Sequence, residues 1–213
     1  MAYVCAIIIG YLLGCVNSAY FLGKLHGFDI RTKGSFSAGA SNAKITMGWP
    51  YFFIVLIYDL CKAALAVYIV GKLFPDVYPA KVLAGCCAVV GHCYPFYLNW
   101  KGGKGFASYI GLMAILDFWF AAGCSAVCVI VSFIVNWIVA GTLVNIISFP
   151  IWMAVVRKAD WLSVLFISLT TLLIIWKHRM NFVKLANHKE IGINGNYVGT
   201  KIKAEVAPGE EAK

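Results

Sequence analysis

The chain has 213 residues, of which 62% are hydrophobic and 13% are charged, and its mean hydropathy is +0.81. A soluble domain carries roughly twice this share of charged residues, so the composition excludes disordered, coiled-coil and collagen-like chains and argues against an ordinary soluble enzyme. Basic residues (18) exceed acidic ones (9), which gives a net charge of +9. We interpret the excess as positive loops of a membrane protein rather than a nucleic-acid-binding face, because no soluble domain remains to present one.

Long apolar runs are the predicted elements. A helix needs about 20 residues to cross the hydrocarbon core, and the candidate runs in chain order are 3–22, 50–70, 80–98, 106–156 and 161–176. The fourth run is too long for one span, and it is interrupted by Asp117, Gly123, Asn136, Gly141 and Pro150. Hydropathy by itself permits two long spans or three short ones there.

The positions of the basic residues select among these topologies. Seven spans with the N-terminus outside put 13 of the 18 basic residues on the cytoplasmic side and four on the other, with Lys62 inside a span. With six spans, the basic residues are divided almost equally between the two sides of the membrane. Because Lys and Arg are enriched in cytoplasmic loops, the sequence predicts an all-α integral membrane protein, a seven-transmembrane-helix bundle with a cytoplasmic C-terminus. We expect a single domain over 1–213, with a polar cytoplasmic tail at about 193–213.

The first polar segment, residues 33–42, holds small residues, hydroxyls and one amide in ten positions. Small residues let the backbone approach a ligand, and hydroxyls with exposed N–H groups can bind an anion. A flexible polar loop is the alternative interpretation. The candidate ligands are Ser35, Ser37, Ser41 and Asn42.

The second polar segment, residues 91–106, contains Lys-Gly-Gly-Lys-Gly directly before an apolar run. Free N–H groups at a helix start favour negative charge, and glycine permits close approach, so the pattern is typical of a phosphate cradle. It is not a Walker A loop, because Leu98 and Gly105 stand where that loop needs Gly and Ser or Thr. A membrane-interface loop is the alternative. The candidate phosphate-binding residues are Lys101, Gly102, Gly103, Lys104 and Gly105.

The third polar segment, residues 177–190, begins with His178 and Arg179. If the preceding helix continues, His178 and Asn181 share one face. A histidine beside an arginine can act as an acid, a base or a phosphate ligand, and the alternative is a basic helix end at the lipid headgroups. The predicted topology puts all three polar segments at the cytoplasmic surface, which indicates a site for a phosphorylated substrate. Asp59 and Lys62 lie inside a span at i, i+3 spacing, and we favour a structural pair over a transport role.

At these residues the sequence resembles the bacterial acyl-phosphate:glycerol-3-phosphate acyltransferase family. Its motifs read roughly G-S-G-N-x-G-A-T-N, G-H-x-x-P-x-F-x-x-K-G-G-K-G and H-R-x-N followed by R-L-x-x-G-x-E, and the resemblance spans nearly the whole chain in order and spacing. The matching residues are Gly91, His92, Pro95 and 101–105 in the second motif, and His178, Arg179, Asn181, Leu185 and Glu190 in the third. Departures are Phe36, Ser37, Ser41 and Ile45, where the family has Gly, Asn, Thr and Arg, and Lys184 and His188, where it has Arg and Gly.

The resemblance implies a seven-helix fold with its N-terminus outside, in the bacterial inner membrane. It implies transfer of an acyl group from acyl phosphate to the 1-hydroxyl of glycerol 3-phosphate at the cytoplasmic face, giving lysophosphatidate and phosphate. No metal, cofactor or acyl-enzyme is implied; membrane lipid and an enzyme that supplies acyl phosphate are implied partners, and nucleic acid is not. Two alternatives remain: a divergent paralogue with another polyol-phosphate acceptor, and a non-catalytic lipid-binding or transport protein.

The resemblance also implies roles for individual residues. Ser35 and Lys104, with the backbone N–H groups of 102–105, would hold phosphate. His178 and Asn181 would orient the acceptor, and His178 is the candidate base if the protein supplies one. Glu190 and His92 are expected to be structural.

Overall fold

The protein is described by a computed structural model over residues 1–194 and 196–199. The described residues form helices and one isolated bridge between Ile191 and Tyr197, so the predicted all-α class is confirmed. Most of the predicted polar tail at 193–213 lies outside the described residues. In chain order the helices are α1 (Ala2–Cys15), α2 (Ser18–Leu25), η1 (Ile30–Thr32), α3 (Ala40–Met47), α4 (Trp49–Leu73), α5 (Tyr78–Cys93), η2 (Phe96–Leu98), α6 (Phe106–Leu116), α7 (Phe118–Ile134), α8 (Ile138–Val155), α9 (Trp161–Lys177) and α10 (Arg179–Ala186).

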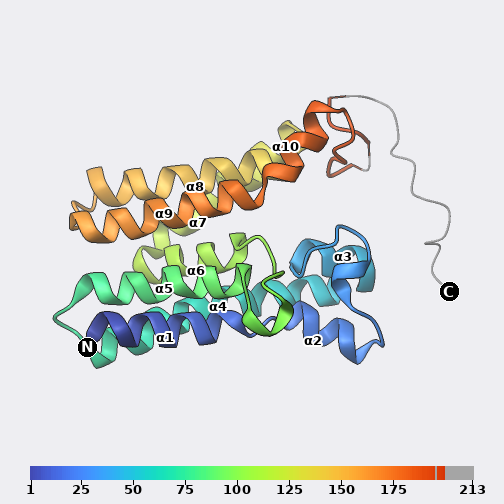
Figure 1. The fold of residues 1–213 in the computed structure, drawn as a ribbon. Helices are drawn as coiled ribbons and strands as arrows, with labels where there is room; N and C mark the ends of the chain where they lie inside the picture. Colours follow the sequence, from blue (N-terminus) through green and yellow to red (C-terminus); the bar gives the residue numbers. More distant parts are fainter. Residues whose placement is uncertain (195, 200–213) are drawn as a thin grey trace.

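Two groups of helices lie side by side: α1, α2, α4, α5 and α6 in one, and α7, α8 and α9 in the other (Figure 1). Helix α5 is central, because it packs against α1, α4 and α6 and also against α9 of the second group. Helices in lipid gain from close approach of their backbones. At Gly14 the backbone of Ala88 lies so near that a Cβ would not fit, which explains the tight seam between α1 and α5.

The first predicted span, 3–22, is confirmed as one apolar segment, Ala2–Leu25, long enough to cross a membrane, and its helix has an interruption. Helix α1 ends at Cys15, and α2 begins at Ser18 after an extended Asn17. The Asn17 side chain accepts a hydrogen bond from the Tyr20 N–H and therefore caps α2. Hydropathy does not reveal this break, because both sides of it are apolar.

The predicted run 106–156 contains three helices, α6, α7 and α8. The first break is at Asp117, whose carboxylate caps α7 by accepting the Phe120 N–H at 3.2 Å and binds the Trp152 indole N–H at 2.8 Å. Four described segments are long and apolar enough to cross a membrane, and α9 with α10 gives a fifth if that bent pair is one span. The apolar helices α6 and α7 are shorter.

The three polar segments lie at the same end of the bundle, opposite the N-terminus (Figure 1). The first segment joins η1 to α3, the second joins α5 to α6, and the third contains α10. Their convergence, predicted from charge alone, is confirmed by packing of the Ala38 carbonyl against Gly103 and by the hydrogen bond between Lys104 of the second segment and Asn181 of the third.

Candidate active site

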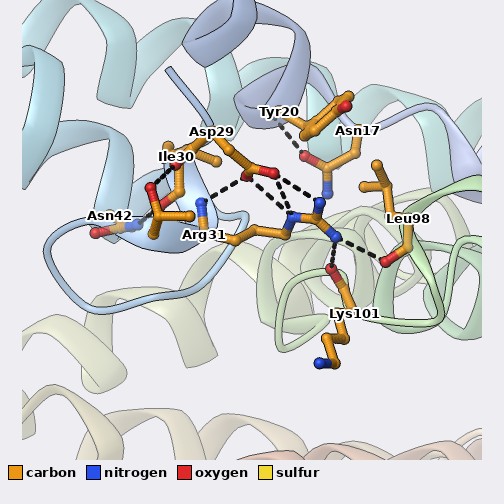
Figure 2. A network of polar contacts seen from close by, with 9 residues as sticks. Asn17, Tyr20, Asp29, Ile30, Arg31, Asn42, Leu98 and Lys101 are labelled. Carbon is orange, nitrogen blue, oxygen red and sulfur yellow. Dashed lines mark hydrogen bonds and ion pairs between the residues drawn. The ribbon is translucent and has the colours of Figure 1, made fainter.

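The first polar segment is folded around the side chain of Asn42. The Asn42 amide group donates to the Ile30 carbonyl at 2.8 Å (Figure 2). It also donates to the Lys33 carbonyl at 3.1 Å, and the Asn42 side-chain oxygen accepts the Ser35 N–H at 2.7 Å. Asn42 is 1% exposed. The amide donates twice inside the loop, so Asn42 organises this segment, and its role as a substrate ligand stays a prediction.

Arg31 joins the first polar segment to the second. Its guanidinium binds the Asp29 carboxylate at 2.7 Å and donates to the carbonyls of Leu98 and Lys101 at 2.7 and 3.4 Å (Figure 2). The hydrogen bond from Arg31 holds the pKa of Asp29 below its ordinary value. Sequence reasoning missed this residue, although the Asp-x-Arg spacing before the segment is a signal for such a pair.

The second polar segment folds back onto the end of α5. The Gly102 N–H donates to the Cys93 carbonyl at 3.2 Å, and the Gly103 N–H donates to the His92 carbonyl at 3.1 Å. These two amides therefore donate to carbonyls of the protein in this structure, and the phosphate-binding role of the two glycines stays a prediction. A Cβ at Gly103 would collide with the Ala38 carbonyl and the His92 ring, so this glycine is required by packing.

Lys104 connects the second polar segment to the third. Its Nζ donates to Asn181 Oδ1 at 2.6 Å, and Asn181 Nδ2 donates to Glu190 Oε1 at 2.7 Å. The lysine can only donate and the carboxylate can only accept, so the orientation of the Asn181 amide is fixed. Glu190 Oε1 also accepts the Trp137 indole N–H at 3.3 Å, which links the third polar segment to the start of α8; the structural role of Glu190 stays a prediction. Burial lowers the pKa of Lys104, and the charge of Glu190 opposes the shift.

His178 lies at the junction of α9 and α10, which meet at 41°. The helix therefore does not continue straight through this residue, which was the condition for His178 and Asn181 to share one helix face. His178 Nδ1 lies 2.8 Å from the Ile174 carbonyl. A carbonyl can only accept a hydrogen bond, so Nδ1 carries the imidazole proton and Nε2 of the neutral ring has a lone pair. Burial lowers the pKa of His178 to about 4, so the ring is neutral at pH 7.

The remaining predicted ligands lie at the rim of the site. Ser35, Ser41 and Lys101 are exposed, and Ser37 is half-buried. Arg179 is exposed and stacks over the Trp176 ring, with its Nη1 donating to the Trp176 carbonyl at 3.0 Å. Gly105 has a φ of +92° directly before α6, a conformation that favours glycine.

The predicted Asp59–Lys62 pair is present and involves His92. Lys62 Nζ lies 2.8 Å from both Asp59 Oδ1 and His92 Nδ1. Within the described residues there is no group of three or more His, Cys, Asp or Glu able to hold a metal ion.

Comparison with known proteins identifies the family. The family model for glycerol-3-phosphate acyltransferase matches residues 4–188. The chain belongs to this family. Curated relatives called glycerol-3-phosphate acyltransferase are 36% identical in Coxiella burnetii, over 89% of this chain and 97% of the relative, and 34% identical in Clostridioides difficile, over 89% and 94%.

Solved structures agree with this membership. The crystal structure of PlsY, an integral membrane glycerol 3-phosphate acyltransferase, in its glycerol 3-phosphate form superposes with a TM-score of 0.84 at 25% identity, covering 91% of this chain and 96% of that one. Its lysophosphatidic acid form gives a TM-score of 0.81 at 25% identity, covering 90% and 95%. The protein is therefore an integral membrane, multi-pass member of the family.

Two departures from the family pattern can be located in the structure. Phe36, where the pattern has Gly, has a φ of +58° and is 68% exposed. Ile45, where the pattern has Arg, is 57% exposed on α3. The neighbouring Lys44 extends over the Trp49 ring, 4.1 Å from its centroid, so its ammonium is directed to that ring and does not take the place of an arginine at 45.

Proposed function

We propose that this protein transfers a fatty acyl group from acyl phosphate to the 1-hydroxyl of glycerol 3-phosphate, giving lysophosphatidate and inorganic phosphate without an acyl-enzyme. The observation that carries the proposal is the hydrogen bond between Lys104 and Asn181, which joins two of the family's motifs in one polar site. The solved relatives, in glycerol 3-phosphate and lysophosphatidic acid forms, support the acceptor and the product.

The reaction needs little covalent help from the protein. The acceptor oxygen forms a bond to the acyl carbonyl carbon, and the bond from that carbon to the phosphate oxygen breaks, with the electron pair leaving on phosphate. Because acyl phosphate is already activated, the site mainly positions two anions and stabilises developing charge. Lys104 supplies the fixed positive charge, and Asn181 together with Glu190 holds its ammonium in place.

The hydroxyl proton has two candidate acceptors. His178 offers a neutral Nε2, but burial lowers its pKa to about 4. A phosphate group has a second pKa of about 6, so it is the stronger base. We therefore assign the proton to a substrate phosphate oxygen, with His178 orienting the acceptor hydroxyl. The α6 N-terminus follows Lys104 and Gly105 directly, with no side-chain cap among the described residues, and its N–H groups can bind phosphate in place of those of Gly102 and Gly103.

For the membrane, we propose seven crossings in the bacterial inner membrane, with the N-terminus outside and the site at the cytoplasmic face. The single-domain assignment over 1–213 is part of this proposal. The short helices α6 and α7 count as separate crossings, and the bias of basic residues toward the end that carries the three polar segments supports the orientation. An enzyme that releases acyl phosphate at the same face is the implied partner.

An acyl acceptor other than glycerol 3-phosphate is the alternative function that a specific observation favours. The exposed Ile45 and the displaced Lys44 leave α3 without the family's cation at that position. A different polyol phosphate, bound with fewer charges on this side, is consistent with that surface.

The decisive experiment is acyl transfer by the purified protein in lipid nanodiscs. Acyl phosphate is compared with acyl-CoA as donor, and glycerol 3-phosphate with other polyol phosphates as acceptor. Lysophosphatidate formed from acyl phosphate but not from acyl-CoA is the expected result. Transfer from acyl-CoA but not from acyl phosphate would contradict the proposed donor. A higher rate with another polyol phosphate than with glycerol 3-phosphate would contradict the proposed acceptor.

A further inference from the structure

Three buried polar residues lie behind the site without contributing to the proposed reaction. Asp59 and Lys62 are on α4, His92 is near the end of α5, and they are 1%, 4% and 3% exposed. Lys62 Nζ lies 2.8 Å from Asp59 Oδ1, 2.8 Å from His92 Nδ1 and 3.1 Å from the Val16 carbonyl. We call Asp59, Lys62 and His92 the buried triad.

The contacts of Lys62 assign the protons in the triad. A lysine ammonium has N–H donors and no acceptor; here it donates to the Val16 carbonyl and meets His92 Nδ1 at hydrogen-bond distance, while its 2.8 Å contact with Asp59 Oδ1 is an ion pair without hydrogen-bond geometry. His92 Nδ1 must then accept, which puts the imidazole proton on Nε2. Asp59, whose Oδ1 is also 3.4 Å from His92 Nδ1, balances the ammonium charge. Burying a charged pair costs desolvation free energy that an apolar replacement avoids. We therefore expect the pair to fix the positions of neighbouring residues rather than to add to the stability of the fold.

The triad contacts the backbone that carries Lys104. The Gly103 N–H donates to the His92 carbonyl at 3.1 Å, and a Cβ on Gly103 would collide with the His92 ring. Gly103 is next to Lys104, so the position of His92 sets where the Lys104 side chain begins. Lys62 fixes the His92 ring from the other side.

The triad also reaches the first polar segment. Lys62 holds the Val16 carbonyl in the break between α1 and α2, and the adjacent Asn17 donates its side-chain amide to the Ala38 carbonyl at 3.0 Å. The same Ala38 carbonyl packs against Gly103. One ammonium therefore fixes both sides of the contact between the first and second polar segments.

We propose that Asp59, Lys62 and His92 are positioning residues that act through Gly103 to hold Lys104 in its hydrogen bond with Asn181. The expected effect on the acyl-transfer rate rests on the proposed function. The expected rigidity of the turn at 102–103 does not. A misplacement of about 1 Å can reduce a rate about 10²-fold, which is the size of effect that the triad would prevent.

Two sets of variants separate positioning from stability. The double variant Asp59→Leu with Lys62→Met removes both buried charges together, so the fold keeps no unpaired ion. His92→Asn retains an acceptor near Nδ1 for Lys62, whereas His92→Leu removes it. Asp117→Asn is the matched control, because Asp117 is also a carboxylate of low exposure with hydrogen-bond partners but lies between α6 and α7, after the last residue of α6.

Each full-length variant is measured in nanodiscs by acyl transfer, thermal unfolding and amide hydrogen exchange. We expect the double variant to keep its melting temperature, to lose about 10²-fold in kcat and to exchange faster in peptides covering 101–105 but not in the core of α6. His92→Asn should retain more kcat than His92→Leu, and Asp117→Asn should match the wild type in kcat and in exchange at 101–105.

The outcomes distinguish this proposal from the proposed function. A folded double variant with wild-type kcat and wild-type exchange at 101–105 overturns the positioning role. If the wild-type protein transfers no acyl group, the proposed function fails, and faster exchange at 101–105 in the double variant still supports the mechanical link. Equal kcat in His92→Asn and His92→Leu, with both proteins folded, contradicts the part assigned to the Lys62–His92 contact.

Discussion

The junction of Lys104, Asn181 and Glu190 differs from the first polar segment in the hydrogen-bond partners of its polar side chains. At the junction, side chains from segments far apart in sequence bind one another at 2.6 and 2.7 Å. In the first polar segment the side chain of Asn42 binds nearby backbone, while Ser35 and Ser41 remain exposed. A charged group held by hydrogen-bonded, partly buried neighbours is already placed for reaction, so the junction is preorganised, whereas the exposed serines can still adapt to a ligand.

The largest expected effect tests the junction. Lys104→Ala removes the positive charge at the site, and we expect kcat/KM for acyl transfer to fall by about 10²–10³-fold, as for loss of a preorganised electrostatic group. Steady-state kinetics in nanodiscs measures it. Lys101→Ala is the matched control, because the Lys101 side chain is exposed on the same loop. Similar rates in the two variants would contradict the special place given to Lys104.

An intermediate effect concerns stability against pH at His178. Its pKa of about 4 in the folded protein lies below the ordinary value of 6.5, so the unfolded chain binds more protons between these values. The free energy of unfolding therefore has its full value with respect to this histidine above pH 6.5. It falls as the pH is lowered from 6.5 to 4, by about 3 kcal/mol in total. We expect His178→Asn to unfold with a weaker dependence on pH over this window.

Thermal unfolding between pH 7 and pH 4 measures this difference. His188→Asn replaces an exposed histidine of the same polar segment and should leave the dependence of the wild type unchanged. An identical pH dependence in His178→Asn and wild type would show that the buried imidazole does not titrate as its surroundings imply.

The smallest effect tests the first polar segment. Phe36 has a φ of +58°, a conformation that costs a residue with a side chain about 1 kcal/mol relative to glycine. Phe36→Gly should therefore raise the free energy of unfolding by about 1 kcal/mol. Ser37→Gly, at a residue whose φ is not positive, should lower it by about 0.5 to 1 kcal/mol. A loss of stability in Phe36→Gly would mean that the exposed ring contributes more than the strain costs.

Local spacing predicted part of the site correctly. Asp59 and Lys62 are three residues apart on one helix, so their ion pair follows from helical geometry alone, and the structure has it at 2.8 Å. The convergence of the three polar segments at one end also followed from charge. Spacing left open whether the helix continues through His178, and the structure bends there by 41° between α9 and α10.

The sequence by itself determined the all-helical membrane class, the three polar segments and the family, because these depend on composition, spacing and residue order. Only the tertiary structure decided which polar groups are free. The amides of Gly102 and Gly103 are engaged by carbonyls of α5, and the Asn181 side chain lies between Lys104 and Glu190. A hydrogen bond depends on distance and direction between atoms, and chain packing sets both for residues that are far apart in sequence. The excess of basic residues marked the end of the bundle that carries the site, and the fold brought Lys104 among them into a side-chain hydrogen bond with Asn181 of the third polar segment.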